Sequence, residues 1–576
     1  MDIKENTDLS AWQPGWRERT IERLQAEEKR AGASEWDMVI IGGGITGAGV
    51  FREATRRNLK VLLVEQKDFA WGTSSKSSKM VHGGLRYLGS GQIRLTHDSV
   101  QERQRLMSEA PGLVDPLHFL MGHYRFSFPG PIIFNLLLTF YDWMARRWSH
   151  RFHSKRDTSL CVPGMRDDKL NGATEFGDAV TDDARLVLRV LQEGVAEGGC
   201  ALSYVAADHI EAAESGKAES GKAGAEKKVT LLDEETGASF SVRAKVVINA
   251  TGAWTDALRK KMGKDAVIRP LRGSHLIFPQ WRVPVSYAVS FFHPADKRPV
   301  FLFPWEGVTV VGNTDLDHSL EGRSDISISR EEVDYLLEAL NFQFPGAKVT
   351  EADAIASYSG IRPVVGTGAL NPSSEKREHS IWDDDGVISV AGGKLTTFRL
   401  IALDVLDKAR PHLPGFELNT GDAVIFKHQS VRKVPVGMTT SCFRRLLGRY
   451  GTAAGGILGQ PQISWQKIRT TDTLWGELEW VLANEQVVHL DDLLLRRTRI
   501  GLLLAEGGEE IMPRVKSLCI QHLLWSASKW QKEYERYRLL WQNHFGLPSR
   551  KAREEGPAAQ AQCQQDTATD NNVVSV

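Results

Sequence analysis

The sequence has few cysteines, no excess of charge of either sign and no long apolar run. Its 576 residues include five cysteines, which lie far apart at positions 161, 200, 442, 519 and 563. This spacing excludes a disulfide framework and offers no metal-ligand pattern, so we expect no metal site and a reducing compartment. The formal net charge is zero, which argues against a surface built for nucleic acid.

Long apolar segments are also missing. No stretch reaches the roughly 20 residues that a membrane-spanning helix needs, and the longest candidate, residues 131–140, has about half that length. The N-terminal sequence MDIKENTDLSAWQPGW lacks the basic start and apolar run of a signal peptide. Together these features predict a cytoplasmic protein.

The first folded unit that the sequence indicates is a strand, a glycine loop, a helix and a second strand. MVII and KVLLVE are short apolar runs typical of buried strands. Between them, GGGITG places Gly42, Gly44 and Gly47 in G-x-G-x-x-G spacing. The first glycine permits a tight turn, the second lets the backbone approach a pyrophosphate, and the third lets helix and strand pack closely. Glu65 ends the second strand, where an acid can bind ribose hydroxyls.

The rest of the chain divides by composition. We expect a helix from residue 16 that stops at Gly32, an amphipathic helix from Asp183, and two antiparallel strands in RPVFLFPWEGVTVVGNTD. Residues 436–545 are predicted to be mostly helical. The tandem AESGK repeat at 213–222 is typical of a solvated loop, and the final residues, 551–576, have the composition of a disordered tail.

Two further segments, residues 249–254 and 392–399, favour a flavin over a nicotinamide cofactor, and a third stretch predicts a tightly curved polar loop. The hydroxyl-rich stretch TSSKSSKMVHGGLRYL, residues 73–88, is a poor helix former that ends in His, Arg and Tyr. NATGAW, residues 249–254, is a strand that enters a sharp turn. GGKLTTFR, residues 392–399, starts a helix whose N-terminal amides suit the negative charge of a reduced flavin ring.

These segments, with VIIGGGITGAG, DDARLVL, RGSHLIFP, FPWEGVTVVGNTD and SYSGIRP, occur in the order seen in FAD-dependent glycerol-3-phosphate dehydrogenases. The chain resembles the bacterial respiratory members of that family, within the glycine/D-amino-acid oxidase superfamily, over about residues 36–410. The resemblance implies an α/β fold with α+β elements. A Rossmann-like FAD-binding domain would be interwoven with an antiparallel-sheet substrate domain and followed by a helical C-terminal domain.

The expected domain boundaries are residues 1–35 for an N-terminal extension, 36–120, 165–265 and 350–410 for the FAD-binding domain, 121–164 and 266–349 for the substrate domain, 425–547 for the helical domain, and 551–576 for the tail. Within the substrate domain, residues 134–156 combine an apolar run, aromatics and five basic residues. That composition suits a helix at an anionic membrane surface. A domain-core helix followed by a solvated basic loop explains it equally well.

The resemblance implies FAD as cofactor and a set of residues that bind it. The expected cofactor-binding residues are Gly42, Gly44, Ile45, Thr46, Gly47, Glu65, Thr73, Ser74, Ser75, Ser77, Ser78, Lys79, His82, Gly83, Val205, Ala250, Thr251, Gly252, Gly393, Lys394, Leu395 and Thr396. Hydroxyls of the 73–78 stretch would donate to the diphosphate and ribityl oxygens, and Lys79 would add positive charge.

Oxidation of a secondary alcohol requires a hydride acceptor and a base. A neutral histidine suits the base, because its ordinary pKa near 6.5 leaves it mostly unprotonated at pH 7. His82 ranks slightly ahead of His275 in this role. Arg362 and Arg86 are the candidates for binding a phosphate, since arginine matches phosphate oxygens bidentately.

Lys394 would stabilise the anionic reduced flavin or touch substrate, and Tyr87 would face the substrate cavity. The sequence departs from the family pattern at Arg272, where several relatives have lysine, and at GNTD in place of GTTD.

The implied function is oxidation of sn-glycerol 3-phosphate to dihydroxyacetone phosphate by hydride transfer to FAD, with membrane quinone as electron acceptor. The enzyme would be peripheral on the cytoplasmic face of the inner membrane. The sequence does not decide its oligomeric state, for which a homodimer is one option. Three alternatives remain: a glycerol-3-phosphate oxidase that uses oxygen, another FAD-dependent 2-hydroxy-acid or amino-acid oxidoreductase, and a silent FAD scaffold whose Trp-rich helical C-terminus binds a partner.

Overall fold

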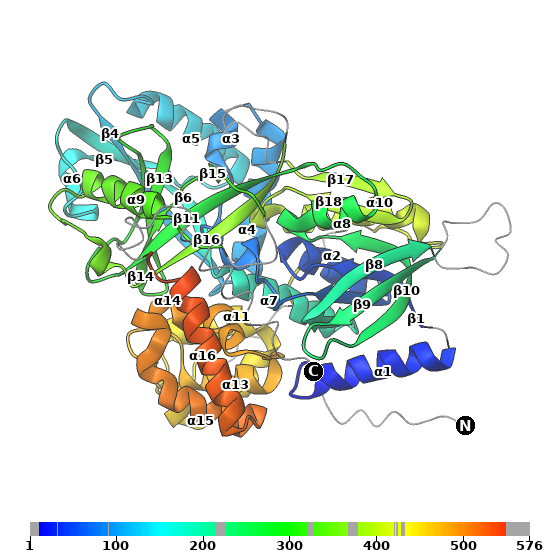
Figure 1. Ribbon diagram of the computed structural model, residues 1–576. Helices are drawn as coiled ribbons and strands as arrows, with labels where there is room; N and C mark the ends of the chain where they lie inside the picture. The colour runs from blue at the N-terminus through cyan, green and yellow to red at the C-terminus, as the bar shows by residue number, and fades with distance from the viewer. Residues whose placement is uncertain are drawn as a thin grey trace, which may run out of the picture.

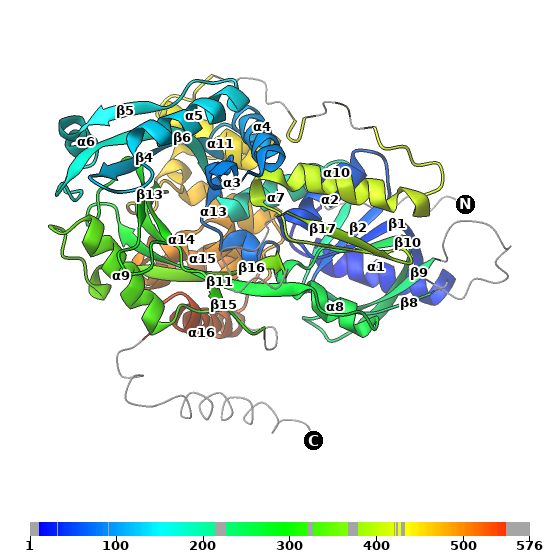
Figure 2. The ribbon, with the colours of Figure 1, turned by 90° about the horizontal axis from the view of Figure 1, so that it is seen from above.

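The computed structural model describes residues 11–31, 33–89, 91–212, 226–320, 326–366, 378–419, 421, 424–427 and 433–548. The AESGK repeat and the predicted disordered tail therefore lie outside the described residues. Figures 1 and 2 show two sheet regions side by side, with a compact group of C-terminal helices packed beneath them in the view of Figure 1.

An eight-stranded sheet forms one of these regions. Its path runs through β17 (Ser380–Asp384), β18 (Val387–Ala391), β10 (Ser239–Asn249), β1 (Ser34–Ile41), β2 (Val61–Glu65) and β7 (Cys200–Ser203), and β8 (Val205–Ala212) and β9 (Lys227–Asp233) continue from β10. The strands from β18 to β7 pair in parallel. Their carboxyl ends therefore share one edge, where loops from distant parts of the sequence meet.

Helices and a strand meander cover the two faces of this sheet. On one face pack α2 (Ile45–Thr55), α7 (Asp183–Val195) and α10 (Phe398–Ala409). On the other lie α1 (Trp16–Ala31) and the β8–β9 pair, with Ile21 and Leu24 against Val39 and Leu62. Since both faces are buried, the strands read as continuous apolar runs in the sequence.

A ten-stranded, mainly antiparallel sheet forms the other region. Its path runs through β15 (Leu316–Asp317), β11 (Ile268–Pro279), β14 (Val308–Gly312), β13 (Pro299–Trp305), β12 (Ala288–Phe292), β4 (Val114–Tyr124), β6 (Leu170–Thr181) and β3 (Met80–Val81), while β16 (Ala356–Val365) pairs with β11 and β5 (Arg151–Ser154) with β6. The helices that follow strands of this sheet in the chain are α3 (Leu85–Gly89), α4 (Ile93–Glu109), α5 (Pro131–Ala145), α6 (Lys155–Cys161) and α9 (Arg330–Gln343), whereas α8 (Thr255–Lys261) follows β10 of the eight-stranded sheet.

The C-terminal helices are α11 (Thr440–Tyr450), α12 (Ala454–Leu458), α13 (Trp475–Asn484), α14 (Ile500–Leu503), α15 (Met512–Leu523) and α16 (Ala527–His544). Their core, which includes Leu478, Leu494 and Val515, is continuous with Phe303 and Tyr358 of the ten-stranded sheet. The C-terminal domain is thus packed as part of the main body rather than attached by a linker alone.

The predicted fold class is confirmed. The glycine loop follows β1 and opens α2, the two strands of the 299–315 segment pair in antiparallel fashion, and the C-terminal region is helical. The ten-stranded sheet also takes in residues 114–120 and 170–181, which the predicted ranges assign to the FAD-binding domain. Because β4 and β6 form one long antiparallel pair, these residues share a sheet with the substrate domain. The domain boundaries stay a prediction.

Among the described residues, no helix has both the length and the apolar character that crossing a bilayer requires.

A charged histidine bridges the C-terminal domain and the β9–β10 hairpin. His489 Nε2 lies 2.9 Å from Glu235 Oε1, and His489 Nδ1 lies 3.0 Å from Glu533 Oε1. Burial opposes the charged form, but the hydrogen bonds to the two carboxylates outweigh it and raise the pKa of His489 to about 9.

This bridge predicts a pH-dependent stability. Since the pKa of His489 is higher in the folded chain than its ordinary value of 6.5, the bridge stabilises fully below pH 6.5 and is lost as pH rises through 9. We expect a loss of roughly 3 kcal/mol of unfolding free energy over that window. His489→Gln should flatten the dependence of melting temperature on pH, whereas the exposed His97→Gln should not; equal slopes in the two variants would contradict the assignment.

Candidate active site

A cavity of about 750 Å³ opens at the carboxyl edge of the parallel strands. Its walls come from the glycine loop after β1, the 3₁₀ turn Thr73–Ser75, the NATGAW segment after β10 and residues 392–395 after β18. These are the segments that the sequence marks as cofactor-binding. The volume lies within the range of about 300–1,000 Å³ that is usual for ligand and cofactor sites.

The glycine loop leaves room for a ligand only because it lacks side chains. Gly42 has φ +113°, and a Cβ there would lie 2.6 Å from the Ala250 carbonyl oxygen. A Cβ on Gly47 would lie 1.9 Å from the Gly42 oxygen, so the start of α2 packs directly on the loop. Gly44 caps α2 without a side chain, and Gly44 and Ile45 line the cavity. The positive end of the helix dipole therefore faces the cavity, as a diphosphate requires.

Glu65 lies at the same edge, at the end of β2. Its carboxylate accepts from the Gly43 amide at 2.7 Å and from the Lys67 amide at 3.0 Å. Burial raises the pKa of Glu65, although these two donors act in the opposite direction. Each carboxylate oxygen keeps a further lone pair for a ribose hydroxyl. The glycine loop, the helix end and the acid together fit a dinucleotide such as FAD.

Most of the predicted cofactor-binding residues line this cavity. They are Gly42, Gly44, Ile45, Thr46, Glu65, Thr73, Ser74, Ser77, Val205, Ala250, Thr251, Gly252, Gly393, Lys394 and Leu395. The predicted residues that do not line it are Gly47, Ser75, Ser78, Lys79, His82, Gly83 and Thr396. The described residues also contain no cluster of His, Cys, Asp or Glu that could hold a metal ion.

Lys79 differs most from its predicted role. Its side chain is fully buried, and its ammonium donates to Asp183 at 2.9 Å and to the Ser75 carbonyl at 3.0 Å. It also lies over the rings of Trp305 and Tyr358. Its charge is therefore directed to a buried carboxylate rather than to a diphosphate. The sequence gives no sign of this, because Asp183 belongs to a helix 104 residues further along the chain.

The hydroxyl-rich loop lies against one face of the β11–β16 strand pair. His275 on β11 is paired with Tyr358 on β16, and their rings stack with centroids 4.5 Å apart. Ser78 Oγ lies 2.9 Å from His275 Nε2, and the Tyr358 hydroxyl donates to the Ser77 carbonyl at 3.0 Å. Asn313 donates to Ser78 Oγ at 3.1 Å, which leaves the serine proton free to point at the imidazole.

Arg362 shares that face with His275. On β16 it is paired with Leu271, four residues before His275 on β11, and its guanidinium lies over Gly273 between them. A Cβ on Gly273 would come within 2.3 Å of the guanidinium. Asp315 accepts from Arg362 Nη1 at 2.8 Å and fixes the fork. His275 and Arg362 thus lie on the same face of the sheet, with only Gly273 between them on that face.

His275 is held in its neutral form. Its side chain is buried, and its Nδ1 has no hydrogen-bond partner among the described residues. Burial, then the positive charges of Arg362 and Lys79, bring the pKa of His275 well below 6.5. An imidazole in this setting is suited to accept a proton at neutral pH.

Lys394, Tyr87 and His82 form a separate group of contacts. Lys394 lines the cavity, and its ammonium lies 3.6 Å from the centre of the Tyr87 ring. The rings of Tyr87 and His82 stack with centroids 6.4 Å apart, and Thr396 Oγ1 donates to the His82 carbonyl at 3.2 Å. The GGKLTT and HGGLRYL segments, both of which carry predicted site residues, therefore contact each other. The side chain of Arg86 lies outside the described part of the chain.

The sequence did not reveal several residues of the cavity. Trp254, which ends the NATGAW segment, packs with Trp71, and both line the cavity with ring centroids 5.3 Å apart. His318 also lines it, three residues after the GNTD segment. Burial, then the charge of Arg272, lowers the pKa of His318. Trp254 could have been predicted to line the cavity, because it lies inside a cofactor motif. No sequence motif marks His318.

Comparison with known proteins agrees with this geometry. Residues 37–399 match the family model described as FAD dependent oxidoreductase, and residues 413–530 match the C-terminal domain of alpha-glycerophosphate oxidase. The first match covers more than half of the chain. Fold and site therefore define an FAD-dependent oxidoreductase.

Individual relatives identify a more specific family within these oxidoreductases. The aerobic glycerol-3-phosphate dehydrogenase of Staphylococcus haemolyticus (strain JCSC1435) is 32% identical over 492 residues, covering 81% of this chain and 86% of that protein. The enzyme of the same name from Staphylococcus aureus (strain MRSA252) is 31% identical over 491 residues, with the same coverage of both chains. Within the FAD-dependent oxidoreductases, the chain belongs to the aerobic glycerol-3-phosphate dehydrogenase family.

Solved structures agree on the fold. The glycerol-3-phosphate dehydrogenase from Bacillus halodurans, complexed with FAD, superposes with a TM-score of 0.68 at 24% identity, covering 92% of this chain and 98% of that one. The FAD-bound L-alpha-glycerophosphate oxidase from Mycoplasma pneumoniae has a TM-score of 0.51 at 17% identity, covering 66% of this chain and 95% of that one.

Proposed function

We propose that the protein oxidises sn-glycerol 3-phosphate to dihydroxyacetone phosphate, with membrane quinone as the final electron acceptor. The observation that carries the proposal is the neutral His275 beside Arg362 on one face of the β11–β16 pair. A base and a fixed guanidinium are what a phosphorylated alcohol requires. The names of the relatives support the same substrate. Bound FAD supplies the hydride acceptor.

In this proposal His275 is the base for the proton of the substrate hydroxyl, and the proton reaches Nε2 through Ser78, whose Oγ lies 2.9 Å from that nitrogen. Ser78 is the hydrogen-bond partner that fixes the ring, and Tyr358 stacks on its face. The burial of His275 and the neighbouring cations support this role, because they keep the imidazole unprotonated at neutral pH. This reverses the order that the sequence favoured, in which His82 came first. His82 does not line the cofactor cavity, and its stacking on Tyr87, over whose ring the cavity residue Lys394 lies, supports an indirect role through these neighbours instead.

Arg362 binds the phosphate in this proposal. Asp315 holds one nitrogen of the fork at 2.8 Å, and the bare Gly273 makes room for the guanidinium itself, which lies directly over it. Lys394 and Tyr87 would contact the reacting end of the site from the cavity side, and Arg86 stays a candidate second phosphate ligand. The remaining cavity residues named above would hold FAD.

The substrate and the acceptor are tested by steady-state turnover with purified protein. We expect activity with sn-glycerol 3-phosphate and a soluble quinone analogue, and little activity with glycerol, lactate or an amino acid. Stoichiometric peroxide in air, with no quinone reduction, would favour a glycerol-3-phosphate oxidase. Turnover of lactate or an amino acid in preference to the phosphate ester would refute the substrate assignment.

The oligomeric state is not tested by this experiment, and a homodimer stays a prediction.

A surface around α5 supports a membrane as partner. One face of α5 is buried through Phe134, Leu138 and Tyr141, whereas Leu136 and Trp143 on the other are 71% and 68% exposed. Further large apolar side chains exposed around it are Phe126, Phe128, Ile132, Ile133, Phe140, Trp148 and Phe152. Figure 2 shows α5 beside β5 and α6 at one end of the molecule. An apolar surface of this size on one end suits insertion into a lipid interface.

Basic residues border this surface. Arg146, Arg147, Arg151, Lys155 and Arg156 are exposed around the end of α5 and the start of α6. Each basic residue close to an anionic leaflet contributes about 1 kcal/mol of attraction. We therefore propose that the enzyme docks through α5 on the anionic cytoplasmic face of the inner membrane, which would bring it to its quinone.

Charge reversal tests this docking. We expect Arg146→Glu with Arg147→Glu to lower binding to phosphatidylglycerol-containing vesicles by about tenfold or more, because four units of charge change at the interface. The control is Lys516→Glu with Lys532→Glu, which makes the same charge change at exposed positions on α15 and α16. Co-sedimentation with anionic and with phosphatidylcholine vesicles measures it. Equal loss in both double variants, or no vesicle binding by the wild type, would refute the docking surface.

A further inference from the structure

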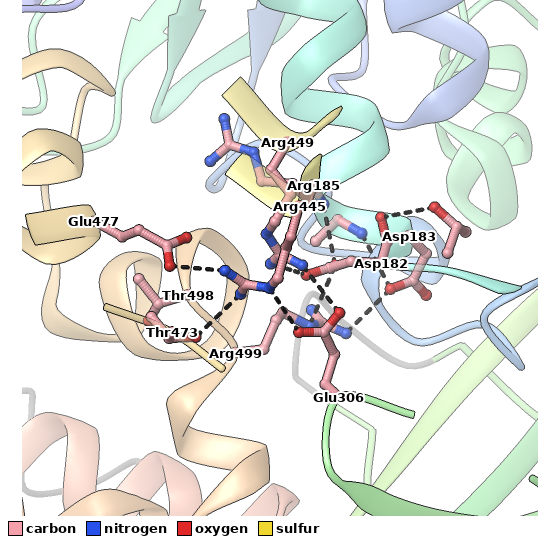
Figure 3. Close-up of polar contacts among 12 residues, drawn as sticks. Asp182, Asp183, Arg185, Glu306, Arg445, Arg449, Thr473, Glu477, Thr498 and Arg499 are labelled. Carbon is pink, nitrogen blue, oxygen red and sulfur yellow. Dashed lines mark hydrogen bonds and ion pairs between the residues drawn. The ribbon is translucent and has the colours of Figure 1, made fainter. Parts of the chain in front are cut away.

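A buried network of charges joins the C-terminal domain to the start of α7. Figure 3 shows Asp182 and Asp183 facing Arg449 and Arg499, with Glu306 from the ten-stranded sheet beside them. Arg449 donates to Asp182 at 2.6 Å and to Glu306 at 3.2 Å. All of these except Glu306 are almost completely buried. Removal of one partner would leave an uncompensated charge in the interior, so the network is sensitive to single changes.

Arg499 extends this network to the hydroxyl-rich loop. It stands at the N-terminus of α14 with φ +64°, and it is 1% exposed. Its Nη2 donates to the Ser75 carbonyl at 2.7 Å and to Asp183 Oδ1 at 3.1 Å, while its Nη1 donates to the Leu495 carbonyl at 2.8 Å. One guanidinium from the C-terminal domain therefore holds a backbone carbonyl of a cofactor-site loop.

Asp183 transmits the same contact along the loop. Its Oδ2 accepts from the Ser77 amide at 3.0 Å and from Ser77 Oγ at 2.7 Å. Lys79 donates to both oxygens of Asp183 and to the Ser75 carbonyl. The residues from Ser75 to Lys79 are thus fixed at both ends by one carboxylate and two cations.

The loop held in this way carries two functional contacts. Ser77 lines the cofactor cavity, and Ser78 is hydrogen-bonded to His275. The Tyr358 hydroxyl, which donates to the Ser77 carbonyl, belongs to the ring that stacks on His275. Displacement of the Ser75 carbonyl would therefore move both the cavity wall and the partner of the imidazole.

We propose that Arg499 is a positioning residue, by which the C-terminal domain holds the Ser75–Lys79 loop against the cofactor cavity and His275. The part of this inference that concerns His275 rests on the proposed function, whereas the part that concerns the cofactor cavity does not. On this view the C-terminal domain is a component of the active site, although none of its described residues lines the cavity.

The test compares Arg499→Gln with Arg449→Gln. Both arginines are 1% exposed and belong to the same charge network, but in the described structure only Arg499 has a hydrogen bond to the loop. We expect Arg499→Gln to raise the dissociation constant of FAD by about tenfold, since a charge-assisted contact to the loop is lost. It should also change the pH profile of kcat. Arg449→Gln should leave both within about twofold while it lowers the melting temperature.

A second pair of variants decides the question if Arg499→Gln does not fold. Arg499→Lys and Arg449→Lys keep the charge and lose the fork. Hydrogen exchange of the holoenzyme should show faster exchange in the peptide that contains Ser75–Lys79 for Arg499→Lys only. Equal FAD affinity and equal exchange in the two members of each pair would overturn the proposal. FAD affinity and hydrogen exchange are measured without a substrate, so these two results are independent of whether sn-glycerol 3-phosphate is the substrate; only the pH profile of kcat depends on it.

Discussion

Replacing His275 with asparagine is expected to lower kcat by about 10³-fold, because a positioned general base contributes roughly 10²–10⁴-fold. Asparagine keeps a polar group of similar size beside Ser78, so the loop and the cavity should persist. His82→Asn is the matched control, and it should lower kcat by less than about tenfold if His82 only supports the cofactor. Stopped-flow measurement of flavin reduction at saturating substrate separates the two variants. A larger loss in His82→Asn than in His275→Asn would restore the order that the sequence favoured.

If His275 is the base, as proposed, it is also expected to set the pH dependence of the wild-type enzyme. Burial, Arg362 and Lys79 bring the pKa of His275 well below 6.5. A base must be unprotonated to act, so kcat should be constant through neutral pH and fall only as pH drops through this lowered pKa. If kcat already decreases above pH 7 as the pH is lowered, His275 is not the group that titrates.

Replacing Arg362 with alanine is expected to lower kcat/KM for sn-glycerol 3-phosphate by about 10³-fold, since a fixed guanidinium makes strong, bidentate contacts with a phosphate. Arg362→Lys keeps the charge but loses the fork, and it should lie between the wild type and Arg362→Ala. The control is Arg282→Ala, whose guanidinium is held by Asp353 at 2.7 Å on another part of the substrate region. It should leave kcat/KM unchanged.

Arg362→Ala should also move the pH profile. The charge of Arg362 is the second cause, after burial, that lowers the pKa of His275. Without that charge the protonated imidazole becomes less unfavourable, so the pKa rises and the acid limb of kcat shifts to higher pH. Unchanged kcat/KM, or a loss that is equal for the phosphate ester and for glycerol, would remove Arg362 from phosphate binding.

Local motifs made the fold and the cavity predictable. Gly42, Gly44 and Gly47 lie within six residues of one another, between two apolar runs, so strand, turn and helix follow from nearest neighbours. The same holds for the NATGAW and GGKLTT segments, each of which is a strand end followed by a turn. Parallel strands place such ends at a common edge, and most of the predicted cofactor residues accordingly line one cavity.

The relation between His275 and Arg362 was not predictable, because it depends on the register of β11 against β16. A register shifted by one residue would place Arg362 on the other face of the sheet. The position of Lys79 was not predictable either, because it depends on contacts with distant segments. Its neighbours in sequence suggest a phosphate ligand, but Asp183 and Arg499 arrive from distant segments and fix it in the interior.

The proposed reaction is hydride transfer from sn-glycerol 3-phosphate to bound FAD. The most direct measurement is anaerobic addition of that ester to the purified holoenzyme while the oxidised-flavin absorbance is recorded, followed by the same addition of glycerol and of lactate. We predict rapid and complete bleaching by the phosphate ester alone. A protein that binds FAD but is bleached by lactate, or by none of the three, would refute this reaction.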